Sequence, residues 1–193
     1  MRGRGWRIGS IFVLIPVTII WIVSGIGSPA RADPDEKRPE FVLDEPLPPH
    51  AEPPVDRILV LKAERRLILL AGMESVADYG IALGSAPVGL KRMRGDGRTP
   101  EGLYRIDARK RDSDFHRALH ISYPNAEDLR RARKSGVDPG GSIMIHGLPN
   151  GLGLIGSGHR MVDWTDGCIA VTNEEMDEIW DRVEEGVLVE IRP

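Results

Sequence analysis

Hydrophobic and polar residues alternate in short runs along most of the chain after Val55. Alternation with a period of two is the pattern of strands that bury one face, and turn-forming residues separate the runs. The sequence therefore predicts a mainly β domain. We expect its strands at Arg57–Lys62, Arg66–Ala71, Ala77–Leu83, Gly102–Asp107, Ala118–Tyr123, Ser142–His146 and Val187–Arg192.

Two segments with helical spacing interrupt the strands. The first extends from Asn125 to Lys134, with Asn125 as the N-cap and Gly136 as the stop signal. The second begins with a capping box formed by Thr172 and Glu175. Its apolar residues recur at i, i+3, i+4 and i+7, which predicts one buried stripe made of Met176, Ile179, Trp180 and Val183. The Trp180 indole is therefore expected in the core.

The N-terminal region differs in character from the rest of the chain. Arginines at positions 2, 4 and 7 precede an apolar run from Ile8 to Ile26, and the small-residue segment Ala30-Arg31-Ala32 follows. This order predicts a secretory signal peptide over residues 1–32, cleaved after Ala32. An uncleaved N-terminal anchor, which would be the chain's only contact with a membrane, is the alternative, because the run approaches the length of a spanning helix. Either way the body of the protein is expected to be exported, to the periplasm or cell envelope.

A charged, proline-dense segment occupies residues 33–54 and is predicted to be an extended linker, because it can neither pair in a sheet nor continue a helix. Residues 55–193 then form one domain. With 41% hydrophobic residues the chain can build a core. A formal net charge of -3 lacks the basic excess of nucleic-acid-binding proteins, so nucleic acid is excluded as a partner.

Cys168 is the only cysteine, so it has no disulfide partner within the chain. Outside the cytoplasm an idle thiol is a liability, which favours a chemical role. A free thiol with a pKa of about 8.5 is only a few per cent thiolate at neutral pH, so a nucleophilic cysteine needs a base. We predict that His146, which ends an apolar strand and precedes Gly147, is this base. The backbone N–H groups of Gly167 and Cys168 are expected to form an oxyanion hole.

Three motifs occur in a characteristic order: Gly95-Asp96-Gly97-Arg98-Thr99-Pro100-Glu101-Gly102-Leu103-Tyr104, then Ile145-His146-Gly147, then Gly167-Cys168-Ile169. In this order they resemble the L,D-transpeptidase catalytic domain, also called the YkuD domain, over Val55 to Pro193. The resemblance implies a β-sandwich or barrel with two helices, and a Cys168 nucleophile activated by His146. It also implies peptidoglycan stem peptides as substrates, attacked between an L-centre and a D-residue. No cofactor is expected.

The nucleophile segment departs from the common family pattern. Many members have Ser-His-Gly-Cys-Ile-Arg, whereas this chain has Thr165-Asp166-Gly167-Cys168-Ile169-Ala170. The sequence resembles a branch of exported proteins with an Asp-Trp-Thr-x-Gly-Cys-Ile-Ala-Val motif, some of which hydrolyse wall linkages. We predict transpeptidation through a cysteine acyl-enzyme. Hydrolysis, by an L,D-carboxypeptidase or an amidase that releases wall-linked protein, is the alternative, and a wall-anchored protein is a candidate acceptor or substrate.

Further substrate contacts are expected from Gly147, Tyr123, Arg98, His159 and Asp166. His159 lies in a glycine-rich segment and is expected on a mobile loop near the site. Asp166 can orient His146 or His159, or cap the turn before Cys168, and the turn role is favoured. Arg98 either pairs with a substrate carboxylate or lies on a solvated face. Tyr123 either lines the pocket or is an amphipathic residue at a strand end.

Two other kinds of site were weighed. A metal site made of Cys168, His146, His159 and Asp166 has suitable ligand types but lacks the short paired spacings of zinc sites. His116 and His120 are four positions apart, but Ile121-Ser122-Tyr123 after them favour a strand, in which positions four apart are too distant for easy chelation. A non-catalytic wall-binding module is the alternative from another class, and it predicts that replacing Cys168 by alanine preserves function.

Overall fold

The computed structural model describes residues 53–193. The predicted signal peptide or anchor and nearly all of the predicted linker therefore lie outside the described residues. Between residues 53 and 193, no helix has both the length and the apolar character needed to cross a membrane.

Eight strands form one mixed sheet in the order β3-β2-β1-β8-β4-β5-β6-β7. Pairing is parallel between β1 and β8 and between β6 and β7, and antiparallel elsewhere. The predicted mainly β fold is confirmed. The strands are β1 (Arg57–Leu61), β2 (Arg66–Ala71), β3 (Glu74–Gly80), β4 (Gly102–Ser113), β5 (His116–Ile121), β6 (Met144–His146), β7 (Ile169–Ala170) and β8 (Leu188–Arg192).

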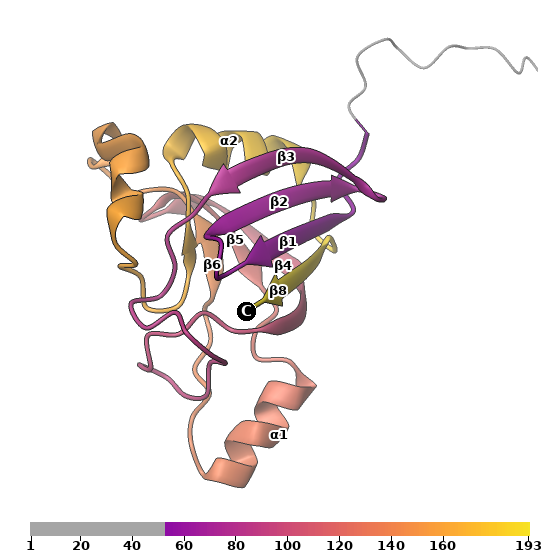
Figure 1. Ribbon diagram of the computed structural model, residues 1–193, viewed down its shortest axis with the longest axis vertical. Helices are drawn as coiled ribbons and strands as arrows, with labels where there is room; N and C mark the ends of the chain where they lie inside the picture. The colour runs from indigo at the N-terminus through magenta and orange to yellow at the C-terminus, as the bar shows by residue number, and fades with distance from the viewer. Residues whose placement is uncertain (1–52) are drawn as a thin grey trace, which may run out of the picture. The chain divides into compact units, whose positions relative to one another are not determined.

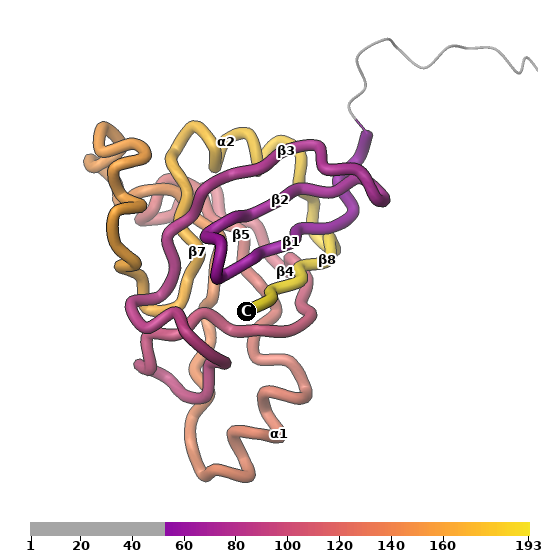
Figure 2. Tube along the Cα trace, viewed as in Figure 1, coloured from indigo at the N-terminus to yellow at the C-terminus, as the bar shows by residue number. Residues whose placement is uncertain are grey.

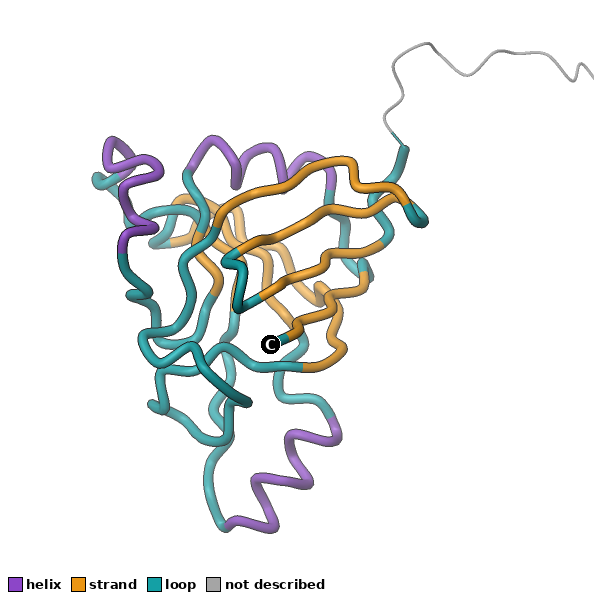
Figure 3. The backbone as a smooth tube through the Cα atoms, in the orientation of Figure 1, coloured by secondary structure: helices purple, strands orange, loops and turns teal. Residues whose placement is uncertain are grey.

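The long strand β4 joins the two halves of the sheet. Its first residues, 102–105, pair with β8, and the remainder pairs with β5. Two register shifts, one after Ile106 and one after Lys110, interrupt the β4–β5 ladder, and such bulges bend a strand and increase its twist. Figures 1 and 3 show β3, β2, β1 and β8 as a layer in front of β5 and β6. The core lies between these layers and includes Val60, Leu67, Leu119, Ile145 and Val189, all fully buried.

Both predicted helices are confirmed. In α1 (Ala126–Ser135) the Asn125 side chain accepts hydrogen bonds from two backbone N–H groups, and Gly136 ends the helix in the left-handed conformation at φ 66°. In α2 (Asn173–Arg182) Thr172 and Glu175 form the capping box. Trp180 is buried, with the Arg109 guanidinium 4.3 Å above its ring. The apolar stripe of α2 thus packs inward, against β5 and β6.

The structure differs from the predicted elements in several places. The strand expected at Gly102–Asp107 extends to Ser113. The strand expected at Ala77–Leu83 begins earlier and ends at Gly80, because Gly72 at φ 63° closes a tight turn directly before it. Two short elements were not predicted: the 3-10 helix η1 (Gly153–Met161) and β7. Because η1 is rich in glycine and β7 is very short, neither shows a periodic pattern of hydrophobic residues. Figure 2 follows the chain from β6 through this region to β7.

The loop between β3 and β4 is irregular but tightly held. The Lys62 ammonium donates to the carbonyl oxygens of Gly89 and Thr99, both at 2.9 Å, and to the Glu101 carboxylate at 2.7 Å. The Thr99 hydroxyl accepts the Gly84 N–H at 3.1 Å. Burial lowers the pKa of Lys62, and the hydrogen bond and charge of Glu101 oppose this shift. These hydrogen bonds therefore hold the loop in one conformation, against which neighbouring segments pack.

Candidate active site

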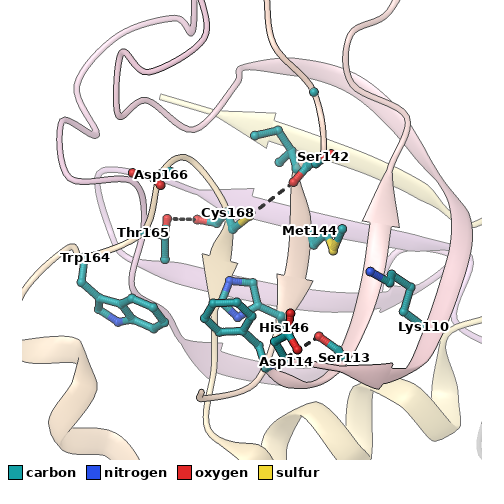
Figure 4. Close-up of a pocket in the computed structure, with 13 residues that line it drawn as sticks. Lys110, Ser113, Asp114, Ser142, Met144, His146, Trp164, Thr165, Asp166 and Cys168 are labelled. Atoms are coloured by element: carbon teal, nitrogen blue, oxygen red, sulfur yellow. Dashed lines mark hydrogen bonds between the residues drawn. The ribbon is translucent and has the colours of Figure 1, made fainter. Parts of the chain in front are cut away.

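Cys168 lies in the turn that leads into β7. The parallel register of β6 and β7 pairs Ile145 with Ile169, which brings the cysteine beside the start of β6. Its Sγ–H donates to the Ser142 carbonyl oxygen at 3.6 Å. Cys168 and His146 both line a cavity of about 520 Å³ (Figure 4), a volume typical of small-ligand sites. The tertiary structure thus brings the predicted nucleophile and base to one cavity.

The imidazole of His146 is held in a defined tautomer. Its Nδ1 lies 2.7 Å from the Gly147 carbonyl oxygen. Because a carbonyl oxygen only accepts hydrogen bonds, Nδ1 carries the proton and Nε2 keeps its lone pair. Burial lowers the pKa of His146, and the hydrogen bond to Gly147 opposes that shift in part. His146 is therefore a neutral acceptor of protons near neutral pH.

The thiol of Cys168 is also neutral at rest. Burial raises its pKa, and the nearby Asp166 carboxylate raises it further, while a backbone hydrogen bond from Met144 acts in the opposite direction. A resting ion pair between Cys168 and His146 is thus disfavoured.

Thr165 fixes the turn that carries Cys168. Its hydroxyl donates to the Cys168 carbonyl oxygen at 2.8 Å and accepts the Gly167 N–H at 3.1 Å. Gly167 has φ 122°, and a Cβ at this position would lie 2.5 Å from the Arg98 carbonyl oxygen. Glycine is therefore required here by both conformation and space. The Gly167 N–H, one of the two expected oxyanion donors, is already bonded to Thr165.

Aromatic rings form the wall beside His146. The Phe115 ring centroid lies 4.6 Å from that of His146, and Trp164 stands edge-on to the same imidazole at 5.8 Å. The Trp164 indole N–H donates to Nδ1 of His159 at 3.5 Å. This packing restrains the imidazole. Phe115 gave no signal in the sequence, whereas Trp164 is part of the motif that ends in the nucleophile.

The other predicted contact residues have different positions. Asp166 lines the cavity and is exposed. Gly147 packs closely against Asn173, because a Cβ at Gly147 would lie 2.7 Å from the Asn173 side-chain oxygen. His159 was expected on a mobile loop, but it is 7% exposed and packs against Trp164 at the end of η1. Its burial corrects that expectation, since a ring enclosed in this way is not on a free loop.

Tyr123 and Arg98 do not line the cavity of Cys168. Tyr123 belongs to the core, where its hydroxyl donates to the Pro139 carbonyl oxygen at 2.9 Å and its ring meets Tyr104 edge-on. The Arg98 guanidinium donates to the Leu90 carbonyl oxygen at 3.1 Å. Both side chains therefore have structural partners, and the Arg98 backbone packs against the turn that carries Cys168.

Several residues that line the cavity were not predicted from the sequence. They come from the β4–β5 hairpin, from the segment before β6 and from the first residue of β6, and they are Lys110, Ser113, Asp114, Phe115, Gly141, Ser142, Ile143 and Met144. Only the pairing of β4, β5 and β6 brings them beside Cys168.

The histidines of β5 have acidic partners. His116 Nε2 lies 2.6 Å from an Asp177 carboxylate oxygen, and His120 Nδ1 lies 2.5 Å from Asp107. Among residues 53–193, no group of three or more His, Cys, Asp or Glu side chains is arranged to hold a metal ion.

A mostly β domain in which a thiol and a neutral imidazole line one cavity is the arrangement used for cysteine-dependent acyl transfer. The family model of the L,D-transpeptidase catalytic domain, YkuD, matches residues 55–191, and the chain belongs to this family. Members of the family act on peptidoglycan in the cell envelope.

Two relatives illustrate the extent of the similarity. A protein of Escherichia coli (strain K12) named "Putative L,D-transpeptidase YafK" is 33% identical over 129 residues, which cover 64% of this chain and 45% of that protein. The crystal structure of a mutant form of the helical cell shape determining protein Pgp2 from Campylobacter jejuni superposes with a TM-score of 0.57 at 25% identity, over 74% of this chain and 48% of that one. The chain thus spans less than half the length of these relatives.

Proposed function

We propose that this protein is a peptidoglycan-modifying L,D-transpeptidase that acts on wall stem peptides through a Cys168 thioester. The observation that carries the proposal is the shared cavity of Cys168 and His146, with the imidazole proton fixed on Nδ1 by Gly147. This arrangement leaves Nε2 as the acceptor for the thiol proton. The predicted export of the domain, through residues 1–32, would place it where its substrate lies.

In the first half-reaction, the thiol proton moves to His146 Nε2 as the sulfur attacks the carbonyl carbon of the stem-peptide bond. The carbonyl electron pair shifts to oxygen. The Cys168 N–H is the proposed donor to this oxyanion, because the Gly167 N–H is held by Thr165. When the tetrahedral intermediate collapses, the C–N bond breaks, His146 returns its proton to the departing amine, and a thioester remains.

In the second half-reaction, a new amine attacks the thioester and His146 takes its proton, so that an amide forms and the thiol is released. The amine belongs to another stem or to a wall-anchored protein. Water in place of the amine gives hydrolysis. Asp166 and Ala170, which replace the His and Arg common in the family motif, are the feature that favours hydrolysis as a second candidate outcome.

The proposal is tested with the purified full chain and a defined muropeptide. Intact-protein mass spectrometry should detect an acyl adduct that peptide mapping assigns to Cys168, and the products should be cross-linked for transpeptidation or shortened for hydrolysis. Cys168→Ala should give neither adduct nor product while it retains the thermal unfolding midpoint of the parent. A folded parent chain without adduct or turnover would overturn the proposal, as would full function in Cys168→Ala, which a non-catalytic wall-binding module predicts.

A further inference from the structure

Positive charge is concentrated on one surface of the domain, which we call the basic face. It is made of residues 91–98, from the loop between β3 and β4, and residues 126–138, which include α1. These residues contain eight lysines and arginines against four aspartates and glutamates, so the basic face has a net charge of +4. The whole chain has a formal net charge of -3. The charge of the protein is therefore unevenly distributed.

Contacts between the two segments hold the basic face together. The Arg94 backbone N–H donates to the Asp138 carbonyl oxygen at 2.8 Å, and the Arg94 guanidinium donates to the Asp138 carboxylate, also at 2.8 Å. Both segments line a second cavity of about 320 Å³, with Arg92 from the loop and Lys134 from α1. This cavity shares no lining residue with that of Cys168. Figure 1 shows α1 projecting away from the sheet, so the basic face lies at one end of the domain.

The carboxylates of the basic face are already paired within it. The pairs are Lys91 with Asp96, Arg94 with Asp138, and Arg131 with both Glu127 and Asp128. Four other cationic side chains are exposed and form no hydrogen bond or ion pair with any residue between 53 and 193. These four are Arg92, Arg130, Arg133 and Lys134. The basic face therefore has four positive charges without compensation.

Three of these four charges share the outer side of α1. Arg130, Arg133 and Lys134 are at positions i, i+3 and i+4, which lie next to one another on a helix. The inner side of α1 holds its two buried residues, Asp128 and Ala132. Like charges at this spacing repel each other, and a surface of negative charge offsets the repulsion. The array is thus complementary to an extended array of anions.

Exposed apolar side chains lie among these charges. Met93, which follows Arg92, is 48% exposed, and Leu129 is 37% exposed. An apolar side chain gains from leaving water only where the partner offers hydrocarbon. A dissolved anionic polymer offers charge alone, whereas a lipid bilayer has phosphate groups with acyl chains beneath them. The combination of cations and apolar side chains therefore favours a bilayer as the partner.

We propose that the basic face binds the surface of an anionic lipid bilayer, with Arg92, Arg130 and Lys134 at the lipid phosphate groups. This contact is additional to any N-terminal anchor, the only membrane contact that the sequence predicts, and it does not depend on the proposed function. Each lysine or arginine close to such a surface strengthens binding roughly fivefold. The predicted export of the domain would bring it beside the membranes of the envelope, with the α1 end turned toward the lipid.

The test is sedimentation of the purified full chain with two kinds of vesicle, one of phosphatidylcholine alone and one that also contains phosphatidylglycerol in equal amount. The apolar run at residues 8–26 can bind both kinds, so the quantity compared is the ratio of the two partition coefficients. One variant combines Arg92→Gln, Arg130→Gln and Lys134→Gln. The matched control changes the net charge equally at exposed positions outside the basic face, and it combines Arg66→Gln, Arg111→Gln and Arg192→Gln.

We expect the parent chain to prefer the anionic vesicles, and salt at about 1 M to abolish the preference, because it screens charges beyond a few Å. In the variant of the basic face the ratio should fall roughly tenfold or more, which corresponds to about 1.4 kcal/mol. In the control variant it should change less than about twofold. A parent chain without the preference overturns the proposal, and so does an equal loss in both variants, which would reflect net charge alone.

Hydrogen–deuterium exchange locates the contact without any substitution. Amides of residues 91–98 and 126–138 should exchange more slowly with the anionic vesicles than with phosphatidylcholine alone, even if the apolar run holds the chain on both. Unchanged exchange in these residues overturns the proposal. Protection by dissolved polyphosphate but not by anionic vesicles also overturns it, because the occupant is then a polymer. Neither measurement requires turnover, so the proposed function is tested separately.

Discussion

The Nδ1–H of His146 donates to the carbonyl oxygen of the next residue, Gly147, across 2.7 Å. The glycine is needed there because Asn173, at the start of α2, occupies the space of a Cβ and accepts the Leu148 N–H at 2.8 Å. Asn173 therefore fixes the backbone at Gly147 and Leu148, in the conformation that directs the Gly147 carbonyl oxygen to the His146 imidazole. A two-residue step in the sequence thus defines the tautomer of the proposed base.

The alkylation of Cys168 should depend on pH with a midpoint above that of a free thiol, because burial and the Asp166 carboxylate raise the pKa of the Cys168 thiol. Rates with iodoacetamide between pH 6 and 11, measured by mass spectrometry, check this. Asp166→Asn removes a like charge and should lower the midpoint, whereas Asp112→Asn should not. A midpoint below 8 in the parent chain would contradict the expectation.

Stability should decrease as the solution is acidified below pH 6.5. Burial lowers the pKa of His146, and burial together with the Arg160 charge lowers that of His159, both from 6.5. Below pH 6.5 these two histidines therefore bind more protons in the unfolded chain than in the folded chain, and the free energy of unfolding falls as the pH decreases. Urea unfolding at pH 7.5, 6.5 and 5.5 measures the slope.

The matched variant for this slope is His146→Gln, which removes one of the two groups. Its free energy of unfolding should change less between pH 7.5 and 5.5 than that of the parent. An equal slope in both proteins would show that His146 titrates in the folded state as it does in the unfolded chain.

Replacement of Thr165 by valine should loosen the nucleophile turn. Valine has a similar shape but leaves the Gly167 N–H and the Cys168 carbonyl without their partner, so we expect a loss of roughly 1–3 kcal/mol in unfolding free energy. The rate of acyl-enzyme formation should fall as well. Thr165→Ser keeps the hydroxyl and should restore most of both quantities; a serine variant as impaired as the valine variant would argue against the hydrogen bonds.

Replacement of Gly167 by alanine should be more damaging than the same change at Gly158. At Gly167 the new Cβ meets the Arg98 carbonyl oxygen at 2.5 Å with φ at 122°, a strain of about 2 kcal/mol or more. At Gly158 the new Cβ has only an ordinary contact of 3.6 Å with Ile155, and a change within about 0.5 kcal/mol is expected. Chemical denaturation of both variants provides the comparison, and similar losses would refute the steric argument.

Much of the fold could be predicted from local rules. The strand alternation, the Asn125 cap and the Thr172 capping box depend on residues close in sequence, and the structure confirms them. The short β7 and η1 lack any period and were missed for that reason. Cys168 and His146 were selected by chemistry alone, as a lone thiol and a strand-end imidazole.

The sequence by itself determined which elements form and which two side chains could react, because propensity, capping and the intrinsic chemistry of a side chain are properties of short segments. Only the tertiary structure decided that Lys110 and Phe115 border the thiol, that Tyr123 lies in the core, and that His159 is buried. These placements follow from the pairing of β4 with β5 and of β6 with β7, which joins residues far apart in the chain. Such pairings depend on how whole sheets pack, and no local pattern encodes them.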